Sequence, residues 1–387
     1  MSSIINDQKF KKIFDVIIID ISKKNGIEFR RELGKGGYSK VYEIKYNTFI
    51  LAAKIQILKE NDSKEKIIII EKEMNLIVNF YHINIIKTLK TIKNDISLKV
   101  KKKIIDKRNN TSTIKDVKET YYVYTFIIEK AYYFDLASYI YYFKNNFLLK
   151  QSNKNLKIKF INNVNSILIY NFIQQILSGI YYLKKSKYVT FDLKPENVVI
   201  TSNLILKLID FSLMGKFEET NEIKLLKSTF SIMGPEYYNK NFKIDNENLE
   251  KFEIFSLGAI IYFLIFNINV YDNRYKHDPY FDKNKNIELL EKALKNLKEN
   301  KYYDQKLIIF TKKCLNKDIN DRISINNCLE KEKFLYEKDK IYKQIMNNNY
   351  NEKIKIFGEF QKLDCIRKQK FKKKFIYIKI INNKKKK

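Results

Sequence analysis

The sequence predicts an α+β fold with two lobes: a small N-terminal lobe of antiparallel strands with one helix, and a larger, mainly helical C-terminal lobe. Residues 27–60 alternate apolar and polar positions around a cluster of glycines, which is typical of strands joined by a tight turn. Apolar residues recur at helical spacing over 64–80, again over 166–185, and through most of the chain to about residue 335. With 387 residues, of which 45% are hydrophobic, the chain can bury two cores.

The strands of the small lobe can be placed in order. Within 27–60 the alternation indicates two strands joined at the glycines, followed by a third that ends at Lys54. Further strand patterns cover 83–92 and 121–128. Residues 1–26 precede the first strand and are interpreted as an N-terminal extension.

Two polar stretches interrupt this pattern, and one long apolar run follows them. Residues 101–119 are rich in Lys, Asn and Thr, and a similar stretch covers about 144–165. Both have little to bury, so we expect exposed insertions. Residues 254–266 are continuously apolar or small, but this run is shorter than the ~20 residues that cross a membrane. We therefore expect a buried core helix.

The formal net charge of +31 would usually suggest nucleic acid or an anionic membrane as a partner. However, only 6 of the 75 basic residues are Arg, the side chain that reads phosphates and bases best. The Lys excess, together with abundant Asn and Ile, is typical of A/T-rich coding and predicts a mainly solvated surface. The exception is the tail, 336–387: its last part, 367–387, carries 11 basic residues and no acidic one. This tail is either solvated or binds an anionic partner, nucleic acid or a membrane surface.

The chain has three cysteines and two histidines, and the cysteines lack metal-ligand spacing. A disulfide framework or a zinc site is therefore not expected, and an intracellular location in cytoplasm or nucleus fits this composition. The first ten residues lack the pattern of a secretory signal, and no transmembrane segment is expected.

The most informative motif is Asp192-Leu-Lys-Pro-Glu-Asn197, followed by Asp210-Phe-Ser212. It combines a carboxylate, a lysine, an amide and a second carboxylate. Carboxylate and amide oxygens suit a hard cation such as Mg²⁺, while a carboxylate can orient a hydroxyl nucleophile. This set is the one that phosphoryl transfer from a nucleotide requires.

At these residues the sequence resembles the eukaryotic protein kinases of the serine/threonine type, whose catalytic loop reads His-Arg-Asp-Leu-Lys-Pro-Glu-Asn and whose metal loop reads Asp-Phe-Gly. The resemblance implies a two-lobed protein-kinase-like fold over 27–335, with an N-lobe at 27–128, a hinge at 129–135 and a C-lobe at 136–335. It also implies ATP and Mg²⁺ as cofactors and protein serine or threonine hydroxyls as substrates.

The resemblance assigns roles to the residues of the central motif. Asp192 would accept or orient the proton of the substrate hydroxyl, and Lys194 would steady the transferring phosphoryl group. Asn197 and Asp210 would bind Mg²⁺. In the glycine-rich loop Leu33-Gly-Lys-Gly-Gly-Tyr-Ser-Lys-Val41, the family's first two glycines match Gly34 and Gly36, and Ser39 replaces the third.

Further residues of the small lobe match the family's nucleotide-binding positions. Lys54, in Ala52-Ala53-Lys54, would hold the α- and β-phosphates, and Glu73 would pair with it. Ile128 stands at the gatekeeper position, and Glu129 and Ala131 would offer backbone groups to adenine. The resemblance implies that three apolar residues sandwich the base: Val41, Ala52 and Val199.

Motifs of the larger lobe also match. Gly234-Pro-Glu236 resembles the Ala-Pro-Glu that ends the activation segment, and Arg322 stands where its ion-pair partner is expected. Thr229 matches the threonine that faces the catalytic aspartate. Glu253, in Glu253-Ile-Phe-Ser-Leu-Gly258, replaces an aspartate that supports the catalytic loop.

Three residues of the catalytic and metal loops depart from the family pattern. Thr190 and Phe191 replace His-Arg, and Ser212 replaces the glycine of Asp-Phe-Gly. Because Phe191 cannot pair with a phosphate as a guanidinium does, we expect activity independent of phosphorylation at the activation-segment hydroxyls of Thr220, Ser228 and Ser231. The alternative is a catalytically impaired kinase fold that acts as a scaffold or a nucleotide-binding module.

Overall fold

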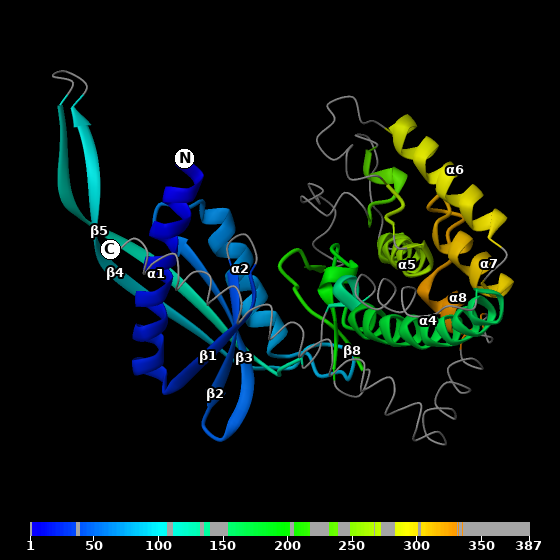
Figure 1. The fold of residues 1–387 in the computed structure, drawn as a ribbon, viewed down its shortest axis with the longest axis horizontal. Helices are drawn as coiled ribbons and strands as arrows, with labels where there is room; N and C mark the ends of the chain where they lie inside the picture. Colours follow the sequence, from blue (N-terminus) through cyan, green and yellow to red (C-terminus); the bar gives the residue numbers. More distant parts are fainter. Residues whose placement is uncertain are drawn as a thin grey trace. The chain divides into compact units, whose positions relative to one another are not determined.

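A computed structural model describes most of the chain up to residue 335 (Figure 1). The described residues are 2–35, 39–106, 111–131, 135–139, 154–201, 205–216, 232–238, 248–266, 268–271, 283–300, 303–330, 332 and 335. The chain divides into two compact units, an N-terminal unit (Met1–His82 and Ile86–Ala131) and a C-terminal unit (Ile83–Ile85 and Tyr132–Lys387). The basic tail predicted at 336–387 lies outside the described residues.

The described strands of the N-terminal unit form a five-stranded antiparallel sheet with the order β1-β2-β3-β5-β4. The strands are β1 (Ile27–Lys35), β2 (Ser39–Tyr46), β3 (Phe49–Lys59), β4 (Thr88–Asp106) and β5 (Thr111–Ile128). The predicted antiparallel sheet is therefore confirmed. The strand expected over 83–92 begins later, at Thr88.

The single helix predicted for this lobe is α2 (Lys64–Ile77). Ser63 caps its N-terminus, since the Ser63 side chain accepts a hydrogen bond from the backbone N–H of Lys66. Its buried residues recur at helical spacing, so one stripe of the helix faces the unit's interior. They are Ile70, Glu73, Met74 and Ile77.

A second helix, α1 (Ser2–Asn25), occupies nearly all of the predicted N-terminal extension. Phe14, Ile17 and Ile21 are fully buried and belong to the same core cluster as Ala53 and Ile55 of β3. Their spacing of three and four residues places them on one stripe of the helix. Helix α1 therefore covers one face of the sheet (Figure 1), a helix that the prediction of an N-terminal extension at residues 1–26 did not include.

Within the insertion predicted at 101–119, residues 101–106 and 111–119 are regular strand. Strands β4 and β5 continue past the sheet as a two-stranded ribbon, paired from Thr88↔Ile128 to Asp106↔Thr111. Strand β3 pairs with β5 only as far as Tyr121, so beyond that residue the two strands pair only with each other (Figure 1). Cross-strand hydrogen bonds do not require an apolar face, which is why composition alone did not reveal this ribbon.

The C-terminal unit is mainly helical, as predicted. Its helices of six or more described residues are α4 (Lys154–Lys185), α5 (Leu249–Phe266), α6 (Lys283–Glu299), α7 (Gln305–Cys314) and α8 (Ile325–Glu330). Short strands β6 (Tyr188–Val189), β7 (Val198–Ile200), β8 (Leu206–Leu208) and β9 (Gly215–Lys216) pair as β6–β9 and β7–β8. Helix α4 starts well before the predicted residue 166, so part of the insertion expected at 144–165 is helical.

Helix α5 is the core helix predicted from the apolar run at 254–266. Its residues from Phe252 to Tyr262 are all buried, on every side of the helix. A Cβ built on Gly258 would lie 2.8 Å from the Cβ of Cys314, so this glycine permits α5 and α7 to pack closely. Among the described residues no helix is both long and apolar enough to cross a membrane.

Candidate active site

The register of the N-terminal sheet gathers the candidate nucleotide-binding residues on one face. Gly34 pairs with Val41, Val41 with Lys54, and Ala52 with Ile128. Directly paired residues share a face, as do residues two apart in one strand, so these five residues lie on the same side of the sheet. Helix α1 packs against the residues that alternate with these along the strands, such as Ala53, and therefore lies on the other face. The candidate face is therefore the one that α1 leaves uncovered.

Lys54 and Glu73 meet on this face. The Lys54 ammonium donates a hydrogen bond to Glu73 Oε1 at 2.9 Å, and the side chain of Glu73 is only 1% exposed. The ammonium also lies 5.4 Å from the centre of the Phe126 ring. A lysine held by a buried carboxylate has a defined position, which an electrostatic grip on phosphates requires. The expected contact between β3 and α2 is therefore present.

Neither the backbone conformation nor the packing around residue 34 requires a glycine there. Gly34 does not have a positive φ, and a Cβ built on it would meet nothing within 4 Å. The fold of the lobe therefore does not account for the missing side chain, whereas close approach of a ligand to the backbone would. Gly36, the second glycine of the predicted loop, lies outside the described residues, as does Gly37.

The two predicted hinge residues lie at the end of the N-terminal unit. The backbone N–H of Glu129 donates to the Lys87 carbonyl at 2.9 Å, and Glu129 Oε1 accepts from the Lys87 N–H at 2.6 Å. The group that Glu129 can offer to a ligand from its backbone is therefore its carbonyl. Ala131 is partly buried and ends the described segment.

In the C-terminal unit, Lys194 and Asn197 converge on Asp192. The Lys194 ammonium lies 2.6 Å from Asp192 Oδ2. Asn197 Nδ2 donates to both the carbonyl and Oδ2 of Asp192, each at 2.9 Å. The 3₁₀ turn η1 (Pro195–Asn197) returns the chain so that these groups can meet. The carboxylate of Asp192 is therefore held in one orientation by charge-assisted bonds.

The two predicted metal ligands are brought to the same end of a small ribbon. Val198 of β7 pairs with Leu208 of β8, and the N–H of Ile209 donates to the Asn197 carbonyl at 2.9 Å. Asn197 and Asp210 flank these paired residues. Because Asn197 uses its Nδ2 to bind Asp192, its Oδ1 is the side-chain atom suited to a cation. The donor set, one amide and one carboxylate oxygen, fits a Mg²⁺ ion that also binds phosphates.

The backbone at Asp210 is left-handed, with φ of +65°. A non-glycine residue in this region costs free energy that the surrounding structure must offset, and such residues cluster at functional sites. Ser212, by contrast, is not among the described residues with positive φ. Its replacement of the family's glycine therefore imposes no backbone strain in this conformation. Val199, predicted to contact the base, lies partly buried in β7.

The loop that carries Asp192 is hydrogen-bonded to helix α5 through Thr190 and Glu253, where the sequence predicted only that Glu253 supports the loop. Glu253 Oε1 accepts two hydrogen bonds from Thr190, one from its backbone N–H at 2.6 Å and one from its hydroxyl at 2.5 Å. The longer Glu253 side chain thus still reaches the loop backbone. Burial raises the pKa of Glu253 to about 7, and the Thr190 bonds offset part of that rise. Sequence reasoning missed the role of the Thr190 hydroxyl.

A second buried contact supports the end of the activation segment. The Arg322 guanidinium binds both carboxylate oxygens of Glu236, at 2.7 and 2.8 Å. It also donates to the carbonyls of Asn316 and Lys251. A Cβ on Gly234 would clash with the Glu236 carboxylate, which explains glycine where the family has alanine. The expected ion pair between positions 236 and 322 is therefore present.

The activation segment itself is not described. Thr229 and the hydroxyl-bearing residues Thr220, Ser228 and Ser231 all lie in 217–231, outside the described residues.

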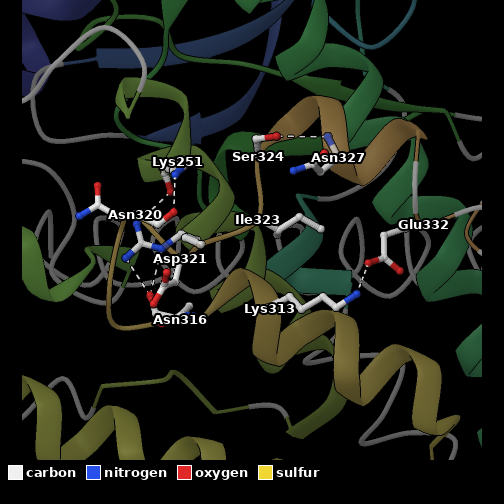
Figure 2. A pocket seen from close by; sticks show the side chains of 10 residues that line it. Lys251, Lys313, Asn316, Asn320, Asp321, Ile323, Ser324, Asn327 and Glu332 are labelled. Atoms are coloured by element: carbon white, nitrogen blue, oxygen red, sulfur yellow. Dashed lines mark hydrogen bonds and ion pairs between the residues drawn. The ribbon is translucent and has the colours of Figure 1, made fainter.

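A pocket of about 460 Å³ opens beside Arg322 (Figure 2). Its cationic groups already have acceptors: Lys251 donates to the Asn320 carbonyl at 2.7 Å, and Lys313 pairs with Glu332. None of the candidate residues of the predicted site lines this pocket. It is therefore not the predicted nucleotide site.

Comparison with known proteins places these observations in one family. The protein kinase domain family matches residues 27–334, which is most of the chain. This protein belongs to the protein kinase family. The match covers both the predicted strand-rich lobe and the predicted helical lobe, and the two-lobed α+β fold is that of a protein kinase domain.

Individual relatives are similar over parts of their length. A probable serine/threonine-protein kinase of Dictyostelium discoideum is 27% identical over 332 residues, covering 79% of this chain and 63% of that protein. Calcium-dependent protein kinase 4 of Plasmodium falciparum is 36% identical over 97 residues, covering 24% of this chain and 17% of that protein. Human death-associated protein kinase 2 is 37% identical over 99 residues, 24% of this chain and 25% of that protein. The chain thus spans less than two thirds of the length of these relatives.

Proposed function

We propose that this protein kinase transfers the γ-phosphoryl group of ATP, with Mg²⁺, to serine or threonine hydroxyls of protein substrates. The observation that carries the proposal is the convergence of Lys194 and Asn197 on Asp192, at 2.6 and 2.9 Å. A carboxylate oriented in this way can accept the proton of a hydroxyl nucleophile. The motif that contains it, with lysine two residues after the aspartate, is the serine/threonine form.

The residues of the N-terminal unit would hold the nucleotide. Lys54, fixed by Glu73, would bind the α- and β-phosphates, and backbone groups near Gly34 and Gly36 would approach them closely. Adenine would donate a hydrogen bond to the backbone carbonyl of Glu129, and backbone groups of Ala131 would also contact it. Apolar contacts to the base would come from Val41, Ala52 and Val199.

The residues of the C-terminal unit would perform the transfer. Asp192 would orient the substrate hydroxyl and take its proton, while Lys194 would exchange its contact with Asp192 for one with the transferring phosphoryl group. Asn197 Oδ1 and the Asp210 carboxylate would hold the metal. When bound, Mg²⁺ supplies neutralisation of the charge that develops on the phosphate oxygens.

We also propose that activity does not require a phosphorylated activation segment. Phe191 takes the place of the arginine that would bind such a phosphate, and its ring lies edge-on to Phe252 at 6.4 Å between centroids. An aromatic ring cannot form the forked, charge-assisted bonds that a phosphate needs. The contact with Phe252 of α5 gives this position an apolar partner that does not depend on a phosphate.

Two experiments test the proposal against its rival, a kinase fold without activity. Purified protein with Mg²⁺ and γ-labelled ATP is expected to label itself or a serine/threonine peptide library, and phosphatase treatment is expected to leave that rate unchanged. If the wild-type protein binds nucleotide but transfers no label, the scaffold or nucleotide-binding reading replaces the enzyme reading. If phosphatase treatment removes most of the activity, the proposal about the activation segment is wrong.

A further inference from the structure

A largely buried carboxylate, that of Glu43, lies on the same face of the sheet as the candidate nucleotide-binding residues. Ala52 of β3 pairs with Glu43 on one side and with Ile128 on the other, and directly paired residues share a face. Only 12% of the Glu43 side chain is exposed. Because the neighbouring residues proposed to contact the base are apolar, a buried charge beside them needs its own explanation.

Two cations hold this carboxylate. Lys130 Nζ lies 2.6 Å from Glu43 Oε2, and the Lys130 side chain is only 10% exposed. The Nε and Nη2 groups of Arg31 each donate to the same oxygen at 3.2 Å. Burial by itself would raise the pKa of Glu43, but the bonds to Lys130 and Arg31 outweigh burial and lower it. Glu43 therefore carries a negative charge at neutral pH.

A bulge in β1 brings Arg31 to this carboxylate. Strand β1 has one residue more than β2 at this point, so Arg30 and Arg31 together stand opposite Glu43. Such a bulge re-aims a side chain and is common beside active sites. Here it allows the Arg31 guanidinium to reach Glu43 Oε2 while the two strands stay paired before and after it. The backbone of β1 thus departs from regular pairing at the residue that binds Glu43.

Lys130 stands between the two hinge residues proposed to contact adenine, Glu129 and Ala131. Glu129 is already held by its hydrogen bonds with Lys87. The ion pair with Glu43 fixes the chain one residue further, and it does so from β2, across the width of β3. A buried ion pair adds little net stability compared with a well-packed apolar contact, whereas it can fix the position of the groups that it joins. The position that this pair fixes is that of the hinge.

We propose that Glu43 is a positioning residue for nucleotide binding: through Lys130 it holds the hinge so that the backbone groups of Glu129 and Ala131 face adenine. This inference rests on the proposed nucleotide site. The pair acts on the segment that binds the base and not on the groups proposed to bind or transfer phosphate. It therefore sets the affinity for the adenosine part of ATP and leaves the transfer step unchanged.

Lys130→Met tests the pair directly, because methionine keeps most of the side-chain length and removes the ammonium. The Kd of the full chain for Mg²⁺–ATP, measured by titration calorimetry, is expected to rise about 10-fold, which corresponds to about 1.4 kcal/mol. The Kd for adenosine, which has no phosphates, is expected to rise by the same factor. KM for ATP should rise with the Kd while kcat stays unchanged. Glu43→Gln should have the same effect, and the double variant should bind no more weakly than the weaker single variant, since both changes remove one interaction.

The matched control is Lys59→Met in the same sheet. Lys59 lies 3.7 Å from Glu119, whose side chain is 10% exposed, so this variant also takes a lysine from a largely buried carboxylate. Lys59 pairs with Tyr121, which belongs to the core that α1 covers, on the other face of the sheet. Lys59→Met should therefore lower Tm without changing the Kd for ATP or adenosine.

Three outcomes overturn the inference. Wild-type protein and Lys130→Met bind both ligands equally well, or Lys130→Met weakens ATP alone, or Lys59→Met weakens both ligands by the same factor as Lys130→Met. A wild-type protein that binds neither ligand would instead overturn the proposed function. If the wild-type protein binds both ligands but transfers no phosphate, the proposed transfer is wrong and the Kd comparison alone decides the role of Glu43.

Discussion

The Arg322–Glu236 ion pair gives a prediction whose size follows from the structure. The Arg322 side chain is fully buried, and its guanidinium binds both oxygens of Glu236 and the carbonyls of Asn316 and Lys251. It also lies 4.8 Å from the centre of the Phe255 ring. Replacing Arg322 by Met would leave the Glu236 carboxylate buried without its counter-ion, which costs about 3–5 kcal/mol of unfolding free energy.

The assay is urea and thermal unfolding followed by far-UV circular dichroism, since the chain contains no tryptophan. At about 2 °C per kcal/mol, Arg322→Met should lower Tm by roughly 6–10 °C. Arg322→Lys should recover little, because an ammonium cannot make the forked contact. The double variant Arg322→Met/Glu236→Leu should be more stable than Arg322→Met alone, since it removes the unpaired charge.

A matched control comes from an exposed ion pair in the same region. Lys317 and Glu291 lie 3.2 Å apart with side chains 56% and 58% exposed. Lys317→Met should change stability by less than about 0.5 kcal/mol, because solvent screens an exposed pair. If Arg322→Met unfolds like the Lys317→Met variant, or if the double variant is no more stable than the single one, the buried pair does not support the lobe as argued.

Three further predictions concern other parts of the molecule. Gly258→Ala should destabilise the C-terminal unit by about 1–3 kcal/mol in urea unfolding, because the new Cβ would meet Cys314 at 2.8 Å; an unchanged midpoint would show that α5 and α7 can separate freely. Lys54→Met should abolish phosphoryl transfer and also lower Tm, because the buried Glu73 carboxylate loses its counter-ion; activity retained at a temperature where the variant is folded would exclude its role. Glu253→Gln should flatten the dependence of Tm on pH: the raised pKa means that this group's stabilising contribution is full below pH 4.5 and is lost as pH rises towards about 7. A curve unchanged between pH 5 and 8 would contradict the assignment.

Much of the site could be predicted because its chemistry is local in sequence. Asp192, Lys194 and Asn197 lie within six residues, and a 3₁₀ turn suffices to bring them together. Lys54 and Glu73 are nineteen residues apart in the sequence. Their ion pair forms as soon as helix α2 packs on strand β3, which directly precedes it in the chain. In both cases the spacing of the residues within the motif was sufficient to predict the contact between their side chains.

Features that depend on tertiary packing were harder to predict. Phe14, Ile17 and Ile21 had helical spacing, yet nothing in their neighbourhood indicated that one face of the sheet needed a cover. The bond between the Thr190 hydroxyl and Glu253 joins residues 63 apart, and each residue separately looked like a loss from the family pattern. Only the structure shows that these two residues are bonded to each other.

The central claim is that the Asp192 loop supports phosphoryl transfer to a serine or threonine hydroxyl. The most direct measurement incubates purified protein with Mg²⁺ and γ-labelled ATP and a peptide library, and then identifies the labelled amino acids, with Asp192→Asn and Asp210→Ala as controls. The account predicts phosphoserine or phosphothreonine from the wild-type protein and at most about a hundredth of that label from either variant. Equal labelling by wild type and Asp192→Asn, or no labelling by the wild-type protein, would contradict it.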